Sequence, residues 1–296
     1  MSSSTVDGLE IATGRCTGAP ALWLPCPKRR GFPTNLPIVN EPSQESATDH
    51  FTVGRSSTLS PIGADDGVEI VVASLAASPE AVDASMALLA PDERRRATSF
   101  VFARDRRRFI RARSRLRELL GARLGEEPES IRLGYGVRGK PALAHPRPNA
   151  DLRFNVSHCD DLAVYAFSIG RELGIDVEFV RAVPEADEIA ERLFSRFERA
   201  AYRRLAPADR PLGFFNAWTR KEAFIKAIGD GLSHPLHHFD VSLAPGEPAR
   251  ILRVLDTPGD RCGWRMRAWI PASGFVAAVV VQDPACGSAP DEEDAY

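Results

Sequence analysis

The sequence lacks the features that mark several protein classes. Its five cysteines include no C-x-x-C pair, so the pattern predicts neither a zinc knuckle nor a disulfide framework. No apolar run approaches the roughly 18 residues of a membrane-spanning helix. The first residues also lack the charged and then apolar segments of an export signal. We therefore expect a soluble, cytoplasmic protein with no membrane partner.

An excess of charge of one sign is also absent, since the formal net charge of the 296 residues is -2. This balance argues against a general polyanion binder and therefore against nucleic acid as a partner. The charge is unevenly spread, because the segment 94–117 holds eleven arginines and a single acid, Asp105. Most of these arginines are expected to form a solvated helix face. Two or three are expected to bind phosphate, because a guanidinium group can make bidentate contacts with it.

Composition divides the chain into a folded part and two flanking segments. Residues 1–62 are rich in Ser, Thr, Pro and Gly without any helical or strand period, which predicts a mobile extension, and residues 284–296 form an acidic tail. The 44% hydrophobic content is sufficient for a packed core. Periodicity and turn residues predict strands at 68–75, 151–158, 162–169, 174–179, 239–243, 251–255, 264–270 and 275–281, and helices from 79, over 91–124 with a possible break near Phe102, over 184–205, and over 218–228.

Two stretches combine acidic and basic side chains in a way that suggests chemistry. Trp218, Glu222 and Lys226 recur at helical spacing, so they share one face of the predicted helix. Asp176 and Glu178 alternate along the predicted strand and point to one side of it. Two carboxylates are suitable ligands for Mg²⁺, and Glu222 is the candidate third ligand. The alternative is a surface strand whose acids face water.

Other polar motifs carry less information. The turn 136–140 ends in Gly-Lys like a phosphate loop, but prolines occupy the place of the helix that follows such a loop. Ser157 lacks the G-x-S-x-G context of a nucleophile. Ser157 and His158 could donate hydrogen bonds to an anion, although His158 alone is equally consistent with an ordinary turn residue. The histidines of the segment 234–238 show no ligand spacing and are interpreted as loop residues.

Four stretches, taken in order, resemble the 4'-phosphopantetheinyl transferases of the Sfp type. The last two are the more specific at this separation, and the resemblance covers roughly residues 68–281. The matching stretches are Arg138-Gly139-Lys140-Pro141, then Phe154-Asn155-Val156-Ser157-His158, then Gly174-Ile175-Asp176-Val177-Glu178, and finally Trp218 with Lys221-Glu222-Ala223, Lys226-Ala227 and Gly231-Leu232.

The resemblance implies an α+β fold of the 4'-phosphopantetheinyl transferase type. In this fold two similar α/β halves, each a small antiparallel sheet packed with helices, form a pseudo-dimer within one chain. The N-terminal half, 63–172, would bind the nucleotide of coenzyme A. The C-terminal half, 173–283, would carry Mg²⁺ and the catalytic residues. Because the pairing is internal, we expect a monomer.

The resemblance also implies a reaction. The 4'-phosphopantetheine arm of coenzyme A would pass to a serine of an apo acyl, peptidyl or aryl carrier protein, as in polyketide, nonribosomal peptide or fatty acid synthesis, with release of 3',5'-ADP. Asp176, Glu178 and Glu222 would hold the metal, and Glu222 and Lys226 would be catalytic. Coenzyme A would be bound by Arg96, Arg108, Arg138, Gly139, Lys140, Ser157, His158, Lys221 and Lys226. Glu93 stands where family members often have a lysine, so Arg94 or Arg95 would have to compensate at the 3'-phosphate.

Two other functions fit parts of the pattern. A metal-dependent nuclease would use the D-x-E strand and the E-x-x-x-K helix, with the arginine-rich segment on nucleic acid. Such enzymes usually carry the lysine two residues after the second acid, where this chain has Val180. A non-catalytic module could bind a nucleotide or an acidic protein in the same cleft, but the complete set of three acids argues against it.

Overall fold

The computed structural model describes residues 67–144, 151–229, 234–254 and 263–283. The expected extension 1–62 and acidic tail 284–296 lie outside the described residues, as does the Gly231-Leu232 end of the last motif. Within the described ranges, no helix is long and apolar enough to cross a membrane.

The elements fall into two runs with the same order, each a strand, three helices, a short 3-10 helix and four strands. The first run is β1 (Glu69–Ser74), α1 (Pro79–Ala87), α2 (Pro91–Thr98), α3 (Ala103–Leu124), η2 (Pro128–Ser130), β2 (Leu133–Tyr135), β3 (Pro141–Leu143), β4 (Leu152–Cys159) and β5 (Leu162–Ile169). The second is β6 (Leu173–Phe179), α4 (Ala186–Leu193), α5 (Arg196–Arg204), α6 (Arg210–Ile228), η4 (Leu236–His238), β7 (Phe239–Val241), β8 (Ile251–Val254), β9 (Trp264–Trp269) and β10 (Phe275–Gln282).

The two runs also form the same sheet. The first makes a three-stranded antiparallel sheet in the order β1-β5-β4, and the second makes one in the order β6-β10-β9. Each adds a small two-stranded sheet, β2-β3 or β7-β8. The expected α+β fold with two similar halves is therefore confirmed.

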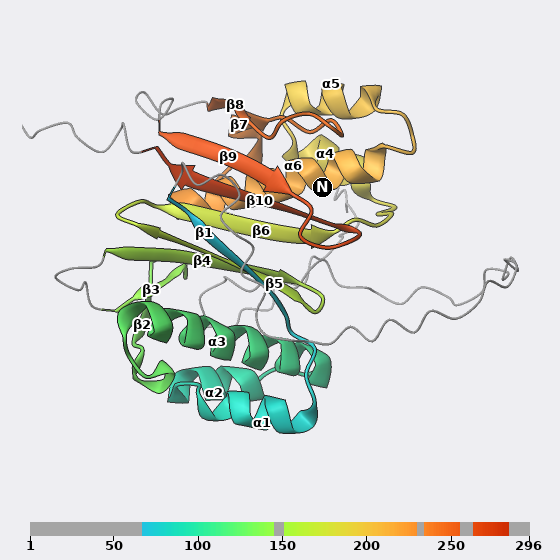
Figure 1. Cartoon of the computed structure of the whole chain (residues 1–296). Helices are drawn as coiled ribbons and strands as arrows, with labels where there is room; N and C mark the ends of the chain where they lie inside the picture. Colours follow the sequence, from blue (N-terminus) through green and yellow to red (C-terminus); the bar gives the residue numbers. More distant parts are fainter. Residues whose placement is uncertain (1–66, 145–150, 230–233, 255–262, 284–296) are drawn as a thin grey trace, which may run out of the picture.

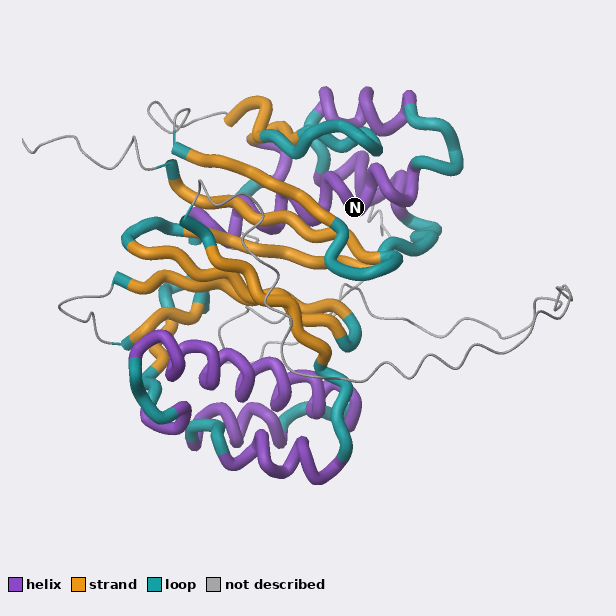
Figure 2. The backbone as a smooth tube through the Cα atoms, in the orientation of Figure 1, coloured by secondary structure: helices purple, strands orange, loops and turns teal. Residues whose placement is uncertain are grey.

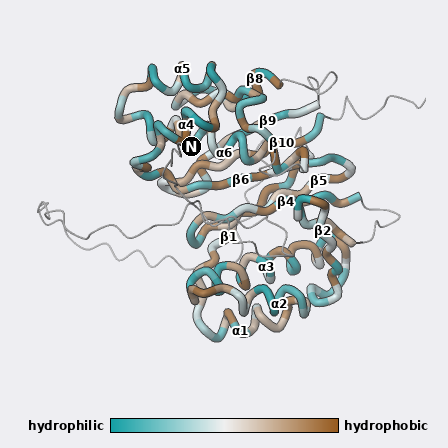
Figure 3. The backbone as a smooth tube through the Cα atoms, turned by 180° about the vertical axis from the view of Figure 1, so that it is seen from behind, coloured by the Kyte–Doolittle hydropathy of each residue, from teal (hydrophilic) through white to brown (hydrophobic). Residues whose placement is uncertain are grey.

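The halves meet sheet against sheet, with helices on the outside. In Figures 1 and 2 the helices α1–α3 lie at the bottom, the two sheets form the middle layers, and α4–α6 lie at the top. The cluster between the sheets includes Val164 and Ala166 of β5, Ile175 and Val177 of β6, and Val279 of β10. Figure 3 shows hydrophobic segments along the central strands and hydrophilic ones on the outer helices α2 and α5. Apolar area removed from water between and behind the sheets therefore holds the halves together.

A buried glutamate has the same structural position in each half. Glu93 of α2 accepts a hydrogen bond from the backbone N–H of Ala90 at 2.9 Å and lies 2.6 Å from Arg117 Nε. Glu198 of α5 accepts from the N–H of Ser195 at 2.9 Å and lies 2.8 Å from Lys221 Nζ. Each glutamate thus caps its helix and pairs with a buried cation of the next one.

The two buried cations continue the correspondence. Arg117 donates to the carbonyls of Pro128 and Ile131 around η2, and Lys221 donates to those of Leu236 and Phe239 around η4. The acid at position 93, which departs from the family pattern, therefore has a structural role in this chain.

Most predicted elements are present, but the prediction of one continuous helix over residues 184–205 is wrong. The segment 184–205 contains two helices, because Phe194 is extended with ψ 150° and Ser195 starts a new helix with its own capping box. The possible break near Phe102 is confirmed, since Phe102 is the N-cap of α3. The hairpin at 160–161 is also present, with Asp160 at a φ of 51°.

Candidate active site

The candidate site forms where α6 lies directly on β6. Gly174 permits this contact, because a Cβ atom there would come within 2.2 Å of the Ala223 carbonyl oxygen and 2.3 Å of the Ala227 nitrogen. Any larger residue would push the helix away. The close approach brings the Glu222 and Lys226 face of α6 to the acids of β6.

Lys226 is the centre of the resulting cluster. Its Nζ lies 2.6 Å from Asp176 Oδ1, 3.1 Å from Ser157 Oγ and 3.3 Å from the Ile175 carbonyl oxygen. The Ser157 hydroxyl also lies 2.8 Å from Asp176 Oδ1, so β4 of the first half contributes directly to a site on the second. Asp176 and Glu178 are 4% and 8% exposed, so the surface-strand interpretation of these acids is wrong.

The charges of the cluster depend on one another. Burial alone would lower the pKa of Lys226, but Asp176 and then Glu222 outweigh this effect and raise it. Burial raises the pKa of Glu222 to about 7, with Lys226 opposing the shift and Asp176 adding to it. Lys226 is therefore held charged, while Glu222 can gain or lose a proton near neutral pH.

The acids of the cluster offer oxygen ligands of the kind that a divalent metal ion prefers. One oxygen, Asp176 Oδ2, is buried and accepts no hydrogen bond, which suits a position that a cation would occupy. In the parts of the chain described, however, no three His, Cys, Asp or Glu side chains are gathered closely enough to hold a metal. The chemistry of the donors thus fits a divalent ion. In the described conformation, Asp176, Glu178 and Glu222 do not come together as a complete set of three ligands.

The duplication of the fold shows that these acids are not required by the architecture. Ser74 pairs with the first residue of β5 and Phe179 with the first residue of β10, which aligns β1 with β6. In this alignment Val71 and Ala73 occupy the places of Asp176 and Glu178. Since the same strand in the same environment is apolar in the other half, the acid pair calls for a functional explanation.

A second charged group lies at the β4–β5 turn. Arg108 of α3 reaches Asp161 Oδ1 at 2.9 Å and Asp160 Oδ1 at 3.2 Å. Burial, together with the positive charges of Lys226 and Arg108, lowers the pKa of His158 to about 4. His158 is therefore neutral at pH 7 and lies in the electrostatic field of both cations. This turn connects Arg108 electrostatically to the Lys226 cluster.

The other predicted ligands of coenzyme A lie in different settings. Arg96 is partly buried with its guanidinium 5.6 Å from the ring centre of Phe109, and burial lowers its pKa. Arg138 is exposed on the turn that contains Gly139, whose φ is 82°. Lys140 Nζ lies 2.8 Å from Glu172 Oε2 and donates to the Leu173 carbonyl at 3.0 Å and the Ala227 carbonyl at 3.2 Å. Lys140 thus joins the first half to β6 and α6.

Lys221 does not join the site. It is fully buried against Glu198, with its ammonium 4.1 Å from the ring centre of Phe239, so its predicted contact with coenzyme A conflicts with its position. The reason is helical geometry, because Lys221 lies about 100° around α6 from Glu222. Trp218 stacks on Phe214 at 6.2 Å, in keeping with a packing role.

Sequence reasoning missed three residues that shape the site. Asn155 accepts a hydrogen bond from the N–H of Ile175 at 2.9 Å and so ties β4 to β6. Asp161 holds Arg108, and Glu172 holds Lys140. Asn155 lies in a motif that had been recognised, but the sequence gives no sign of its partner.

Comparisons with known proteins agree with this arrangement. The profile of the 4'-phosphopantetheinyl transferase superfamily matches residues 172–280, and the profile of the N-terminal region of 4'-phosphopantetheinyl transferases matches residues 75–169. The chain is similar to the 4'-phosphopantetheinyl transferase HetI of Nostoc, with 37% identity over 66% of this chain and 79% of that protein.

Two further relatives match over shorter stretches. The human L-aminoadipate-semialdehyde dehydrogenase-phosphopantetheinyl transferase is 35% identical over 52% of this chain and 53% of its own length. The 4'-phosphopantetheinyl transferase Sfp of Bacillus subtilis is 30% identical over 56% of this chain and 71% of its own. The chain belongs to the 4'-phosphopantetheinyl transferase family.

Proposed function

We propose that this protein transfers the 4'-phosphopantetheine arm of coenzyme A to a serine of an apo carrier protein, giving the holo form and 3',5'-ADP. The observation that carries the proposal is the cluster around Lys226, which draws Asp176 and Glu222 from the second half and Ser157 from the first. Family membership supports the same reaction.

Asp176, Glu178 and Glu222 are the residues that would hold Mg²⁺. The unpaired Asp176 Oδ2 and the acidic surroundings of Lys226 support this assignment. Bound there, the ion would neutralise charge on the pyrophosphate of coenzyme A. Because Lys226 now provides the positive charge beside Asp176, we infer that the side chains of this cluster rearrange when the ligands bind.

The chain's own residues account for the remaining chemistry. The carrier serine attacks the phosphorus nearer the pantetheine, and negative charge grows on the phosphate oxygens and on the departing nucleotide phosphate. Lys226, held charged by its acidic neighbours, stabilises that charge. Glu222 is the proposed base for the serine proton, because a pKa of about 7 suits an acceptor at neutral pH.

The nucleotide end of coenzyme A is assigned to the first half. Ser157 and neutral His158 offer hydrogen bonds to phosphate, and Arg108 lies close enough to influence His158. Arg96, Arg138, Gly139 and Lys140 are proposed as further contacts, of which Lys140 would have to exchange its present partners. This division gives residues 63–172 the nucleotide and residues 173–283 the catalytic groups.

We propose further that the enzyme acts as a cytoplasmic monomer and does not use nucleic acid. The internal pairing of two similar halves supports the monomer, and the net charge of -2 supports the absence of nucleic acid. The carriers would be acyl or peptidyl carrier domains of polyketide or nonribosomal peptide synthesis.

The experiment is an incubation of the full chain with coenzyme A, Mg²⁺ and an apo carrier protein, followed by intact mass measurement. The wild type should add one phosphopantetheine to the carrier. Asp176→Asn and Glu222→Gln should each lose activity by about 10²-fold or more, because each removes charge from the transition-state environment. Glu188→Gln, which changes an exposed acid of α4, is the matched control and should keep full activity.

Other outcomes would select another function. Unchanged activity in both site variants would remove these acids from the mechanism. Absence of the adduct, together with cleavage of nucleic acid in a parallel tube, would favour the nuclease. Binding of coenzyme A without transfer to any carrier would leave the non-catalytic module.

A further inference from the structure

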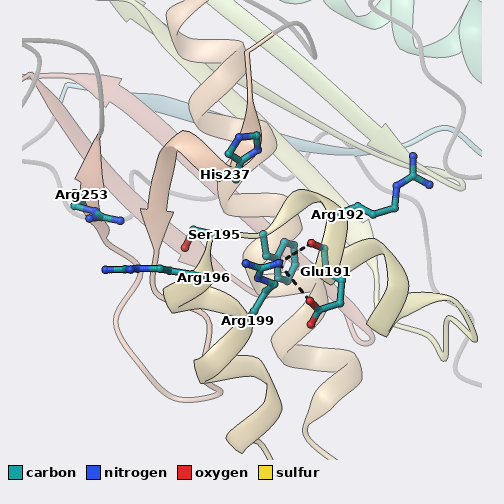
Figure 4. A pocket seen from close by; sticks show the side chains of 8 residues that line it. Glu191, Arg192, Ser195, Arg196, Arg199, His237 and Arg253 are labelled. Atoms are coloured by element: carbon teal, nitrogen blue, oxygen red, sulfur yellow. Dashed lines mark hydrogen bonds and ion pairs between the residues drawn. The ribbon is translucent and has the colours of Figure 1, made fainter.

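A basic pocket lies in the second half, formed by residues that play no part in the proposed site. It has a volume of about 470 Å³ between α4, α5, η4 and β8. Its ionisable lining is Arg192, Arg196, Arg199, His237 and Arg253, with Glu191 as the one acid of the lining. Figure 4 shows Arg196 and Arg253 on one side, His237 above them, and Arg199 turned to Glu191, while Arg192 extends away.

The pocket carries more positive charge than its own acids neutralise. Glu191 is already shared by Arg199 at 3.3 Å and by Arg203 outside the pocket. Arg253 is paired with Asp240 at 2.9 Å. In the described ranges neither Arg192 nor Arg196 forms an ion pair. Since Arg192 extends away, an anion entering the pocket would meet the Arg196 guanidinium, which still lacks a counter-charge.

Two of these cations contact the same aromatic ring. The guanidinium groups of Arg196 and Arg253 each lie 4.7 Å from the ring centre of Phe197, so one aromatic ring supports both. Arg196 is also the first residue of α5, where the helix dipole favours negative charge. Because the shared ring already brings the two groups together, less side-chain freedom would be lost on binding than for two separate arginines.

The fold does not require this charge. In the aligned halves Glu93 corresponds to Glu198, so Ala90 and Pro91 occupy the places of Ser195 and Arg196. By the same alignment Arg94 corresponds to Arg199, and each donates to a carbonyl at the end of the preceding helix, Ala87 or Glu191. Arg199 is thus explained by the architecture, whereas Arg196 is not.

We propose that this pocket binds a small molecule through a phosphate group, at a site separate from the proposed active site. Two guanidinium groups and an imidazole match the several acceptor oxygens of phosphate. The volume falls within the roughly 300–1,000 Å³ of small-molecule pockets. A recess of this kind does not by itself provide the roughly 800 Å² per partner that a standard protein interface buries. None of the residues that line the pocket belongs to the proposed active site.

Inorganic pyrophosphate is the probe, titrated calorimetrically into the full chain at low salt with coenzyme A present to occupy the proposed active site. We expect wild type to bind pyrophosphate and Arg196→Ala to bind it about tenfold or more weakly, as for loss of a charged hydrogen bond. Arg204→Ala removes an exposed arginine from the same helix, outside the pocket, and should bind like wild type. Arg196→Lys keeps the positive charge but loses the paired N–H donors of the guanidinium group. Its affinity for pyrophosphate should lie between those of the other two variants.

Equal affinity in Arg196→Ala and Arg204→Ala, or no pyrophosphate binding by wild type, would overturn the proposal. A higher KM for the carrier protein in Arg196→Ala, with pyrophosphate binding unchanged, would also overturn it and indicate protein docking instead. The comparison between the two variants remains valid if coenzyme A does not bind, so it does not depend on the transferase reaction.

Discussion

Two lysines of one helix, five residues apart, serve different purposes. Lys226 faces the acids of β6 and is partly open, with 16% of its side chain exposed, whereas Lys221 is fully enclosed by Glu198 and two carbonyls. Removing one partner of a buried ion pair strongly destabilises the fold, because the other charge remains buried without a partner. The two lysines should therefore be separable by experiment.

Lys221→Met should lower the free energy of unfolding by about 3–5 kcal/mol, because Glu198 would remain buried and unpaired. The KM for coenzyme A of the protein that still folds should be unchanged. Lys226→Met should instead reduce activity by about 10²-fold or more. Its loss of stability should be smaller, since the side chain of Lys226 is 16% exposed and Asp176 keeps its hydrogen bond from the Ser157 hydroxyl at 2.8 Å. Urea unfolding and steady-state kinetics of both variants provide the measurement. A raised KM with unchanged stability in Lys221→Met would contradict this assignment.

His158 should make stability depend on pH. Its pKa is lowered by burial to about 4 in the folded protein, from 6.5 in the unfolded chain. Below pH 6.5 the unfolded chain binds a proton that the folded protein does not. The stability from this residue is therefore complete above about pH 6.5 and is lost as the pH falls toward 4. At 1.36 kcal/mol per pKa unit the loss is bounded by about 3 kcal/mol.

The measurement is the urea midpoint of wild type and His158→Gln between pH 7.5 and pH 4. The variant should show a shallower decline over this interval, because glutamine does not titrate. Parallel curves for the two proteins would show that His158 does not contribute in this way.

At the scale of the elements, the contact between α6 and β6 leaves the least room for a larger side chain. Gly174→Ala would place a methyl carbon 2.2 Å from the Ala223 carbonyl oxygen, far inside van der Waals contact. We expect a loss of roughly 1–3 kcal/mol or more in stability. We also expect about a tenfold or greater loss of activity, because Glu222 and Lys226 would move with the helix.

Gly134→Ala is the matched control, since it also lies in a strand but its nearest neighbour, Ala144 Cα, is 3.6 Å from the added atom. Thermal unfolding and the transfer assay should separate the two variants. Wild-type behaviour of Gly174→Ala would mean that α6 can shift without affecting the cluster.

The elements that could be predicted from sequence are those with local signals. The strands β4, β5 and β6 and the end of α6 at Gly229, whose φ is 79°, follow from alternation and from a glycine at the cap. The break between α4 and α5 was missed because apolar residues continue at helical spacing across Ser195. The capping box that starts α5 depends on two reciprocal hydrogen bonds between side chain and backbone, which join Ser195 and Glu198.

The site was predicted to a similar extent. Periodicity placed Glu222 and Lys226 on one face and Asp176 and Glu178 on another, and the structure brings Lys226 to Asp176. Periodicity could not show that Lys221 turns into the core, because a lysine in a recognised motif has the same sequence signal whether it meets a ligand or Glu198. Long-range partners such as Asn155 and Ile175 also leave no local trace.

At the scale of the whole molecule, the folded part should not need its N-terminal extension. The buried core residues that the structure describes all lie between Val68 and Val281. Because the Ser-, Thr- and Pro-rich composition of residues 1–62 predicts that they add little to a packed core, deleting them should change Tm by less than about 2 °C. Transfer activity should also be retained. Thermal unfolding and the mass assay measure both. A large fall in activity at unchanged Tm would show that the extension takes part in binding the carrier.

The apolar pair Val71 and Ala73, which matches Asp176 and Glu178 in the aligned strands, sets a limit on what one molecule can do. A repeated architecture could have provided two reaction centres. In the aligned strands, however, Glu69 of the first half corresponds to Gly174, the residue that allows α6 to approach β6 in the second half. Under the proposed function the second half holds the reaction centre, and the first half contributes Ser157 and the contacts with the nucleotide. Each chain would accordingly process a single donor at a time, so its saturation curve should be hyperbolic and without cooperativity.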